Sequence, residues 1–237
     1  MARTAGILTL LLVVAFAGCS DDITCPGDDG SDSPFVTAHV RQRGGERPFT
    51  AASLTVGGDP VPSTLVASVN YREYDEEVLI EGPLLYATLD DSAVIWQPGT
   101  PCTLRVSTDI GFAHAPAVVP TAPVTAAPAT VTLGDSLLVS WSSSDDADFY
   151  SLRAVVRADD DSLVVAASVE DTFYTIQSDE LSMSGVLEGA VSAVSGPLPE
   201  AGAEGNVTGE GWGFFSVSYE TDESDFSTSV LEPVVQR

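Results

Sequence analysis

The sequence predicts an all-β protein with two antiparallel β-sandwiches in tandem, and three observations favour this fold class. Apolar residues alternate with polar ones at a period of two, as in Val36, Ala38 and Val40 between Thr37 and His39. Turn residues separate short β-rich runs, and residues 35–119 carry no long apolar stripe at the helical period of 3.6. A chain of 237 residues is long enough for two domains of about 100 residues each.

The first 18 residues have the pattern of an export signal. Arg3 gives a positive start, and the apolar stretch Ile7 to Ala17 that follows is too short to cross about 30 Å of hydrocarbon comfortably. Small residues then precede a cysteine in Phe16-Ala17-Gly18-Cys19. This arrangement resembles the lipobox of bacterial lipoproteins.

The lipobox resemblance implies that the signal is cut before Cys19, the lipid attachment residue, and that its thiol and new amine are acylated. Several acyl chains anchor durably, because each buried CH₂ contributes about 0.8 kcal/mol and one chain alone is marginal. Ser20 after Cys19 implies sorting to the outer membrane where the organism has one. An ordinary cleaved signal and an uncleaved anchor are the alternatives. We expect a lipid-anchored cell-envelope protein that meets the membrane through this anchor.

Residues 19–34 are predicted to form a flexible acidic tether. The segment from Ser20 to Pro34 is rich in Asp, Ser, Gly and Pro, so it cannot bury apolar surface and extends by charge repulsion. Its aspartates lack the spacing and the closing Glu of a calcium loop, which favours a solvated linker.

Residues 35–119 are predicted to form the first sandwich. Turn residues such as 97–99 and 109–111 separate its β-rich runs. The Pro/Ala-rich segment 119–128 then indicates an edge strand or an interdomain link, because proline removes backbone donors.

Residues 120–228 are predicted to form the second sandwich, followed by a tail at 229–237. A strand ending in Trp141, a short acidic loop and a strand carrying Tyr150 follow one another, with a hairpin turn expected at 159–162 and a closing strand at 214–219. This order resembles the fibronectin type III module over about 105 residues. The long loop 196–211 departs from that pattern.

Two further segments resemble uncharacterised cell-envelope lipoproteins that pair two such sandwiches. One runs from Pro98-Gly99-Thr100 through Leu104-Arg105-Val106 to the Pro120 hinge, and the other is the Gly-rich run from Gly205 to Phe215. No settled activity comes with this resemblance.

The charge balance excludes some partners. The chain has 9 basic residues, all of them Arg, against 35 acidic ones, and a formal net charge of −26. Nucleic-acid binding needs a basic surface that displaces counterions, so we expect no nucleic-acid partner. The negative field is expected to keep the protein soluble and to repel anionic partners.

Cys25 and Cys102 are the remaining thiols once Cys19 is acylated. An exported compartment is oxidising, so we predict a disulfide between them, which would add about 4 kcal/mol in the chain-entropy model. One buried and one exposed free thiol is the alternative, and geometry decides between the two.

The sequence lacks the usual signatures of catalysis. His39 and His114 are isolated in alternating strand patterns, no Gly-x-Ser-x-Gly elbow occurs, and a phosphate loop is impossible without Lys. The closely spaced ligand pairs of zinc sites are also missing. We therefore expect no enzyme activity, no cofactor and no metal.

Two candidate binding features remain. The loop with Asp145, Asp146 and Asp148 is expected to share one end of the second sandwich with Glu200, Glu204 and Glu210, and converging carboxylates suit Ca²⁺, although solvated loop charges are the simpler interpretation. Trp212, between two glycines, is either a ligand contact or a staple at the start of a sheet. Trp141 and Trp96 are expected in the core.

These features together predict a non-catalytic binding or structural module in the cell envelope, with an envelope protein or a glycan as partner. The alternative is a calcium-assisted carbohydrate-binding accessory lipoprotein that uses Trp212.

Overall fold

The protein is all-β, as predicted. The computed structural model describes residues 33–46, 48–74, 84–90, 95–158, 161–199 and 203–233, with residues 84–90 described by their backbone alone. The helical element within these ranges is the three-residue 3-10 helix η1 (Asp222–Ser224). None of the described segments forms a helix long and apolar enough to cross a membrane.

The first half of the chain supplies the strands of the first sandwich, together with two strands from far along the sequence. One sheet holds β1 (Phe35–Arg43), β2 (Phe49–Gly57), β5 (Leu84–Asp90) and β16 (Trp212–Glu220). The facing sheet holds β3 (Leu65–Val69), β4 (Arg72–Glu73), β6 (Pro101–Thr108), β7 (Gly111–Val118) and β15 (Thr208–Gly209). Alternate residues of these strands fill one core, including Val36, Leu54, Leu104 and Phe215, because successive strand residues point to opposite faces.

The second sandwich has its own core around Trp141, Leu152, Leu187 and Phe226. One sheet holds β9 (Thr130–Thr132), β11 (Phe149–Ala158), β12 (Asp161–Val169), β14 (Gly185–Ser195) and β17 (Asp225–Leu231). The other holds β8 (Thr125–Ala126), β10 (Leu137–Trp141) and β13 (Phe173–Ile176). Trp141 is 6% exposed, so its predicted core position is confirmed. Among the described strands, β8 pairs with β10 alone, which makes it an edge strand, as the proline-rich sequence indicated.

Two hairpins occur near the turns that the sequence predicted. β11 and β12 form a hairpin in which Ala158 pairs with Asp161, so residues 161 and 162 of the predicted turn belong to β12. β6 and β7 form another, with Thr108 paired with Gly111. Both hairpins follow from apolar runs interrupted by short polar segments.

Strand β16 differs from the expectation. The sequence suggested that residues 214–219 close the second sandwich, but β16 pairs in parallel with β1, with Phe35 opposite Trp212 and Arg43 opposite Glu220. Its inward side chains belong to the first core. The pairing needs Gly213, because its φ is +134° and an added Cβ would lie 1.9 Å from the Val36 carbonyl oxygen.

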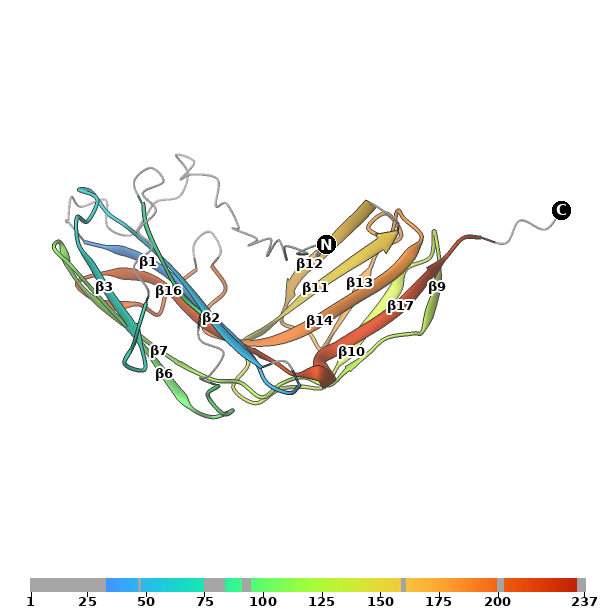
Figure 1. Ribbon diagram of the computed structural model, residues 1–237, viewed down its shortest axis with the longest axis horizontal. Coiled ribbons are helices and arrows are strands. Elements are labelled where there is room, and N and C mark those ends of the chain that lie inside the picture. The colour runs from blue at the N-terminus through green and yellow to red at the C-terminus, as the bar shows by residue number, and fades with distance from the viewer. Residues whose placement is uncertain are drawn as a thin grey trace, which may run out of the picture. The chain divides into compact units, whose positions relative to one another are not determined.

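The end of β16 also pairs with the second sandwich. Its residues 217–219 pair with Ser195, Val194 and Ala193 of β14, so one hydrogen-bonded sheet runs from β12 through β14, β16 and β1 to β5 (Figure 1). β9 and β17 pair in parallel too, so the sheet is mixed. β15 and β16 come from the range 120–228, yet both pack in the first sandwich. The domain boundaries at 35–119 and 120–228 remain a prediction.

Candidate functional site

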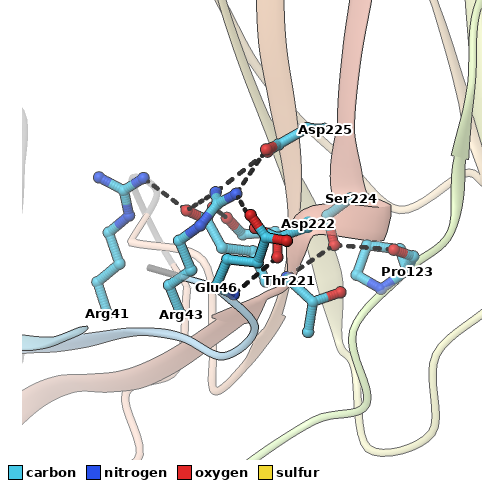
Figure 2. A network of polar contacts seen from close by, with 10 residues as sticks. Arg41, Arg43, Glu46, Pro123, Thr221, Asp222, Ser224 and Asp225 are labelled. Atoms are coloured by element: carbon cyan, nitrogen blue, oxygen red, sulfur yellow. Dashed lines mark hydrogen bonds and ion pairs between the residues drawn. The ribbon is translucent and has the colours of Figure 1, made fainter. Parts of the chain in front are cut away.

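A buried glutamate lies where β16 leaves the first sandwich. Glu220 is 1% exposed, and its Oε1 accepts hydrogen bonds from Arg41 at 2.8 Å and from Arg43 at 3.2 Å. Its Oε2 accepts a 2.5 Å hydrogen bond from the hydroxyl of Ser192 on β14. Figure 2 shows Arg41 and Arg43 of β1 side by side, with dashed lines for their polar contacts. This one carboxylate therefore contacts strands of both sandwiches.

Arg43 extends the cluster to the turn after β16. Its guanidinium contacts Asp222 at 2.9 Å and Asp225 at 2.5 Å (Figure 2). The hydrogen bond to Asp225, followed by those to the other carboxylates, holds the pKa of Arg43 above its ordinary value. Asp222 also accepts from the backbone N–H of Glu46 at 2.8 Å. With its guanidinium mostly enclosed, Arg43 has a structural role.

The turn after β16 is also bonded to the interdomain linker. The Ser224 hydroxyl donates to the Pro123 carbonyl at 2.8 Å and accepts from the Thr221 N–H at 3.1 Å. Thr228 likewise donates to the Pro128 carbonyl at 2.7 Å. These bonds connect β17 to the segment that joins the two sandwiches.

His39 lies on the same face of β1, two residues before Arg41. Its Nδ1 is hydrogen-bonded to Ser216 at 2.8 Å and its Nε2 to Ser218 at 3.0 Å. Burial of the ring, with the positive charge of Arg41 as a second cause, lowers its pKa to about 4. His39 is therefore neutral at pH 7 and belongs to the packed sheet. His114, by contrast, is exposed and stacks on Phe112 with ring centroids 5.7 Å apart.

A second arginine site lies on the outer face of the other sheet. β3 and β4 are joined by the two-residue turn Asn70-Tyr71, and both residues have positive φ, at 48° and 66°. The Tyr71 side chain is 81% exposed, and the guanidinium carbon of Arg105 lies 5.1 Å from the centre of its ring. The contact is a cation–π pair at the protein surface.

Asn70 fixes the position of this turn. Its N–H donates to the Thr103 carbonyl at 3.1 Å, and its side-chain oxygen accepts from the Thr103 N–H at 2.9 Å. Its side-chain nitrogen donates to the Pro101 carbonyl at 3.1 Å. The turn is therefore attached to β6, the strand that carries Arg105.

The strand register places polar side chains in a row across this face. Glu73, Ser68, Arg105, His114 and Thr208 are successive partners on β4, β3, β6, β7 and β15. Directly opposed residues project to the same face. Thr208 contacts the His114 ring at 3.3 Å. Arg105 forms no ion pair with any residue in the described ranges.

The predicted lipid and disulfide residues are only partly covered by the structure. Cys19 and Cys25 lie outside the described residues. Cys102 is 0% exposed in the first core, and burial raises the pKa of its thiol to about 12. The side chain of Asn70 lies 3.7 Å from its sulfur. The Cys25–Cys102 bridge remains a prediction.

Trp212 packs against the first residue of β1. Its ring centroid lies 4.3 Å from that of Phe35, and the backbone N–H of Trp212 donates to the Pro34 carbonyl at 3.1 Å. Of the two interpretations of Trp212 from the sequence, a ligand contact or a staple at the start of a sheet, this packing matches the staple. Trp96 is partly buried against the first core.

The acidic loops meet only in part. Asp148 and Glu204 line one cavity of about 830 Å³ together with Glu170, but Asp148 already accepts from the Gly196 N–H. Glu210 lies elsewhere and accepts from the Phe112 N–H, while Glu200 is outside the described residues. Within the described ranges, no three His, Cys, Asp or Glu residues are grouped to hold a metal ion.

Comparison with known proteins adds little to this geometry. The sequence matches no protein-family model, and it matches no curated protein. Among solved structures, the fold is similar to the crystal structure of chicken CNTN1 FN1–FN3 domains, at 16% identity and a TM-score of 0.24. The match covers 68% of this chain and 60% of that chain. A TM-score of this size carries no argument about function.

The Tyr71–Arg105 pair was not predicted from the sequence. Asn-Tyr is an unusual occupant of a two-residue hairpin loop, in which Asn-Gly is the common signal. Asn70 between two β-rich segments is the signal that could have indicated a hairpin turn here. An arginine on a strand that pairs with this hairpin would then be a candidate contact for the turn. The distance between Arg105 and Tyr71 along the chain hid that relation.

Proposed function

We propose that this chain is a non-catalytic binding or structural module of the cell envelope, held at a membrane by acyl chains on Cys19. The observation that carries the proposal is the shared strand β16, which pairs with β1 of the first sandwich and β14 of the second. The shared strand and the buried Glu220 at its end join the two sandwiches by hydrogen bonds. Such a connection suits the presentation of surfaces at a distance from an anchor.

The anchor is supported by the lipobox-like sequence that ends in Cys19. Labelling of cells with an alkyne analogue of palmitate tests it. We expect label in the wild-type chain and none in a Cys19→Ser variant, which should also leave the membrane fraction. A Cys25→Ser variant is the matched control and should keep the label. An unlabelled wild-type chain would remove the anchor from the proposal.

The module itself is tested by in-cell cross-linking. A photoreactive amino acid at position 71 is compared with one at position 173, an exposed aromatic position on the second sandwich. We expect a discrete covalent adduct in intact cells from at least one of these surfaces. A chain that stays monomeric and unmodified at both positions, and along further scanned surface positions, would contradict a binding role.

A calcium-assisted carbohydrate-binding accessory protein is the alternative. Asp148 and Glu204 on one cavity favour it, whereas the packing of Trp212 on Phe35 gives that ring a structural contact. A glycan array with and without EDTA separates the two ideas. Glycan binding that disappears with EDTA and with Trp212→Ala supports the alternative.

A further inference from the structure

The turn at Tyr71 has a backbone that its residue does not favour. A two-residue hairpin loop with positive φ at both positions is ordinarily occupied by Asn-Gly, because a Cβ strains the left-handed conformation. Asn70 tolerates this conformation, but a bulky tyrosine at φ 66° is an outlier. Since 81% of Tyr71 is exposed, its ring contributes little to the core. A strained residue whose side chain points to solvent favours a role in binding.

Arg105 beside it is exposed and has no carboxylate partner within the described ranges. Arg41, Arg43 and Arg157 form ion pairs. Arg72 and Arg153 form none within these ranges either, but neither is paired with an exposed aromatic ring there. Glu73 is on the same row as Arg105, but Ser68 lies between them. The Arg105 side chain is exposed and lies over the Tyr71 ring, so its guanidinium can reach a ligand on this face.

The rest of the face is polar and carries hydroxyl groups. Ser107 and Thr208 are exposed, and Thr103 and Ser68 are partly exposed. Its apolar members, Val66 at 63% and Phe112 at 43% exposed, lie on either side of Ser107. A protein interface usually has a continuous apolar centre. An aromatic ring, a guanidinium and several hydroxyls on a flat surface instead suit a ligand rich in hydroxyls.

We propose that this face, centred on Tyr71 and Arg105, binds an acidic polysaccharide whose sugars carry carboxylates. One sugar ring lies on the exposed side of Tyr71, and Arg105 forms a two-pronged hydrogen bond with a carboxylate, the geometry that guanidinium favours. Hydroxyls of Thr103 and Ser107 remain for the neighbouring sugars, whereas the Thr208 hydroxyl is bonded to His114. The inference rests on the proposed binding role and gives it a ligand class and a surface.

The net charge of −26 opposes an anionic ligand only at long range. At physiological ionic strength, charges more than about 8 Å away are largely screened, so the groups next to the ligand decide the interaction. Among the described residues of this face, those groups are Arg105 and one carboxylate, Glu73, whereas Arg72 is opposite the core residue Val69 and projects to the other face of the sheet.

The test measures binding of polygalacturonate to the full chain, purified in neutral detergent, by isothermal titration calorimetry at 150 mM NaCl. Fully methyl-esterified polygalacturonate serves as the uncharged control polymer. We expect the acidic polymer to bind and the ester to bind at least about tenfold more weakly, because the loss of a charge-assisted bidentate contact removes roughly this much affinity. Arg105→Gln should lower the affinity for the acidic polymer by about the same factor.

Two variants and their controls keep the test independent of folding. Tyr71→Gly suits the positive φ and should fold, yet it should lose at least about fivefold in affinity, as expected when a stacked ring is removed. Arg153→Gln and Phe173→Ser, an arginine without an ion pair in the described ranges and an exposed ring on the second sandwich, should bind as the wild type does. No binding of the acidic polymer, equal binding of its ester, or equal losses from Arg105→Gln and Arg153→Gln would overturn the inference.

Failure here is separable from failure of the proposed function. If polygalacturonate does not bind while Cys19 is labelled and cross-links form at position 71, the binding module stands and its ligand is a protein or another polymer. If the polymer binds while labelling of Cys19 fails, the face stands and the lipid anchor falls.

Discussion

Two arginine sites of the first sandwich differ in what surrounds them. Arg43 is 13% exposed at its side chain and contacts Glu220, Asp222 and Asp225. Arg105 is exposed and lies against the Tyr71 ring, with no ion pair in the described part of the chain. The difference teaches that an arginine enclosed by carboxylates holds strands together, whereas an exposed arginine over an aromatic ring keeps its guanidinium at the surface.

The largest loss of stability is expected from a substitution at Gly213, because this residue allows the close pairing of β1 with β16. Gly213→Ala places a Cβ 1.9 Å from the Val36 carbonyl oxygen at a φ of +134°, so β1 and β16 cannot keep the pairing that sets Arg43 opposite Glu220. We expect a loss of more than about 3 kcal/mol in the free energy of unfolding. Gly99→Ala, at φ +81° with nothing within 4 Å of the added Cβ, is the control and should cost about 1 kcal/mol. Equal losses in urea unfolding would contradict the close-contact argument.

The next prediction breaks the paired site itself. Glu220→Gln removes the charge between Arg41, Arg43 and Ser192, and it should lower the free energy of unfolding by about 3 kcal/mol, as loss of one partner from a buried ion pair does. Glu188→Gln breaks the pair with Arg157, in which both side chains are 60% exposed, and should cost less than about 1 kcal/mol. Urea unfolding of both variants tests the contrast, which fails if the two losses are alike.

Acid should lower the free energy of unfolding through protonation of His39. Its pKa is about 4 in the fold against 6.5 unfolded, so protonation favours the unfolded chain and stability falls as pH drops from about 6.5 towards 4. The shift corresponds to at most about 3 kcal/mol, and we expect about 2 kcal/mol because the residue is partly exposed. His39→Gln should flatten this part of the pH profile. An unchanged profile in His39→Gln would exclude this residue as the cause.

The smallest effect is expected at the open site. Tyr71→Gly relieves the left-handed strain, so the free energy of unfolding should stay the same or rise by up to about 1 kcal/mol. Thermal unfolding of the variant checks this. A clear fall in stability would mean that the Tyr71 ring holds the fold together, and the contrast between the two arginine sites would disappear.

The sequence predicted the fold class and the second core better than the first. Alternating runs and turn residues are local signals, so the hairpin with Ala158 opposite Asp161 and the buried Trp141 could be anticipated. The parallel pairing of β16 with β1 joins Phe35 to Trp212 across the whole chain. Periodicity says which side of a strand is buried but not which strand lies beside it, so β16 was expected in the other sandwich.

The candidate sites were predicted less well than the fold. The Glu220 cluster and the Tyr71–Arg105 pair both depend on side chains from distant strands, and their residue types are common on any β surface. The prediction for Cys19 rests on a short local motif, and it stays a prediction because Cys19 and Cys25 lie outside the described residues. Convergence of Asp148 and Glu204 was anticipated, while Glu210 lies elsewhere because it bonds the Phe112 N–H.

One paired experiment tests the contrast between the two arginine sites most directly: Arg43→Gln and Arg105→Gln, each measured for urea unfolding and for polygalacturonate binding while folded. We predict that Arg43→Gln loses about 2 to 3 kcal/mol of stability and binds the polymer as the wild type does. Arg105→Gln should keep its stability and lose about tenfold in affinity. If both variants lose both properties, or if Arg43→Gln is the one that loses binding, the separation of a structural and a binding arginine is wrong.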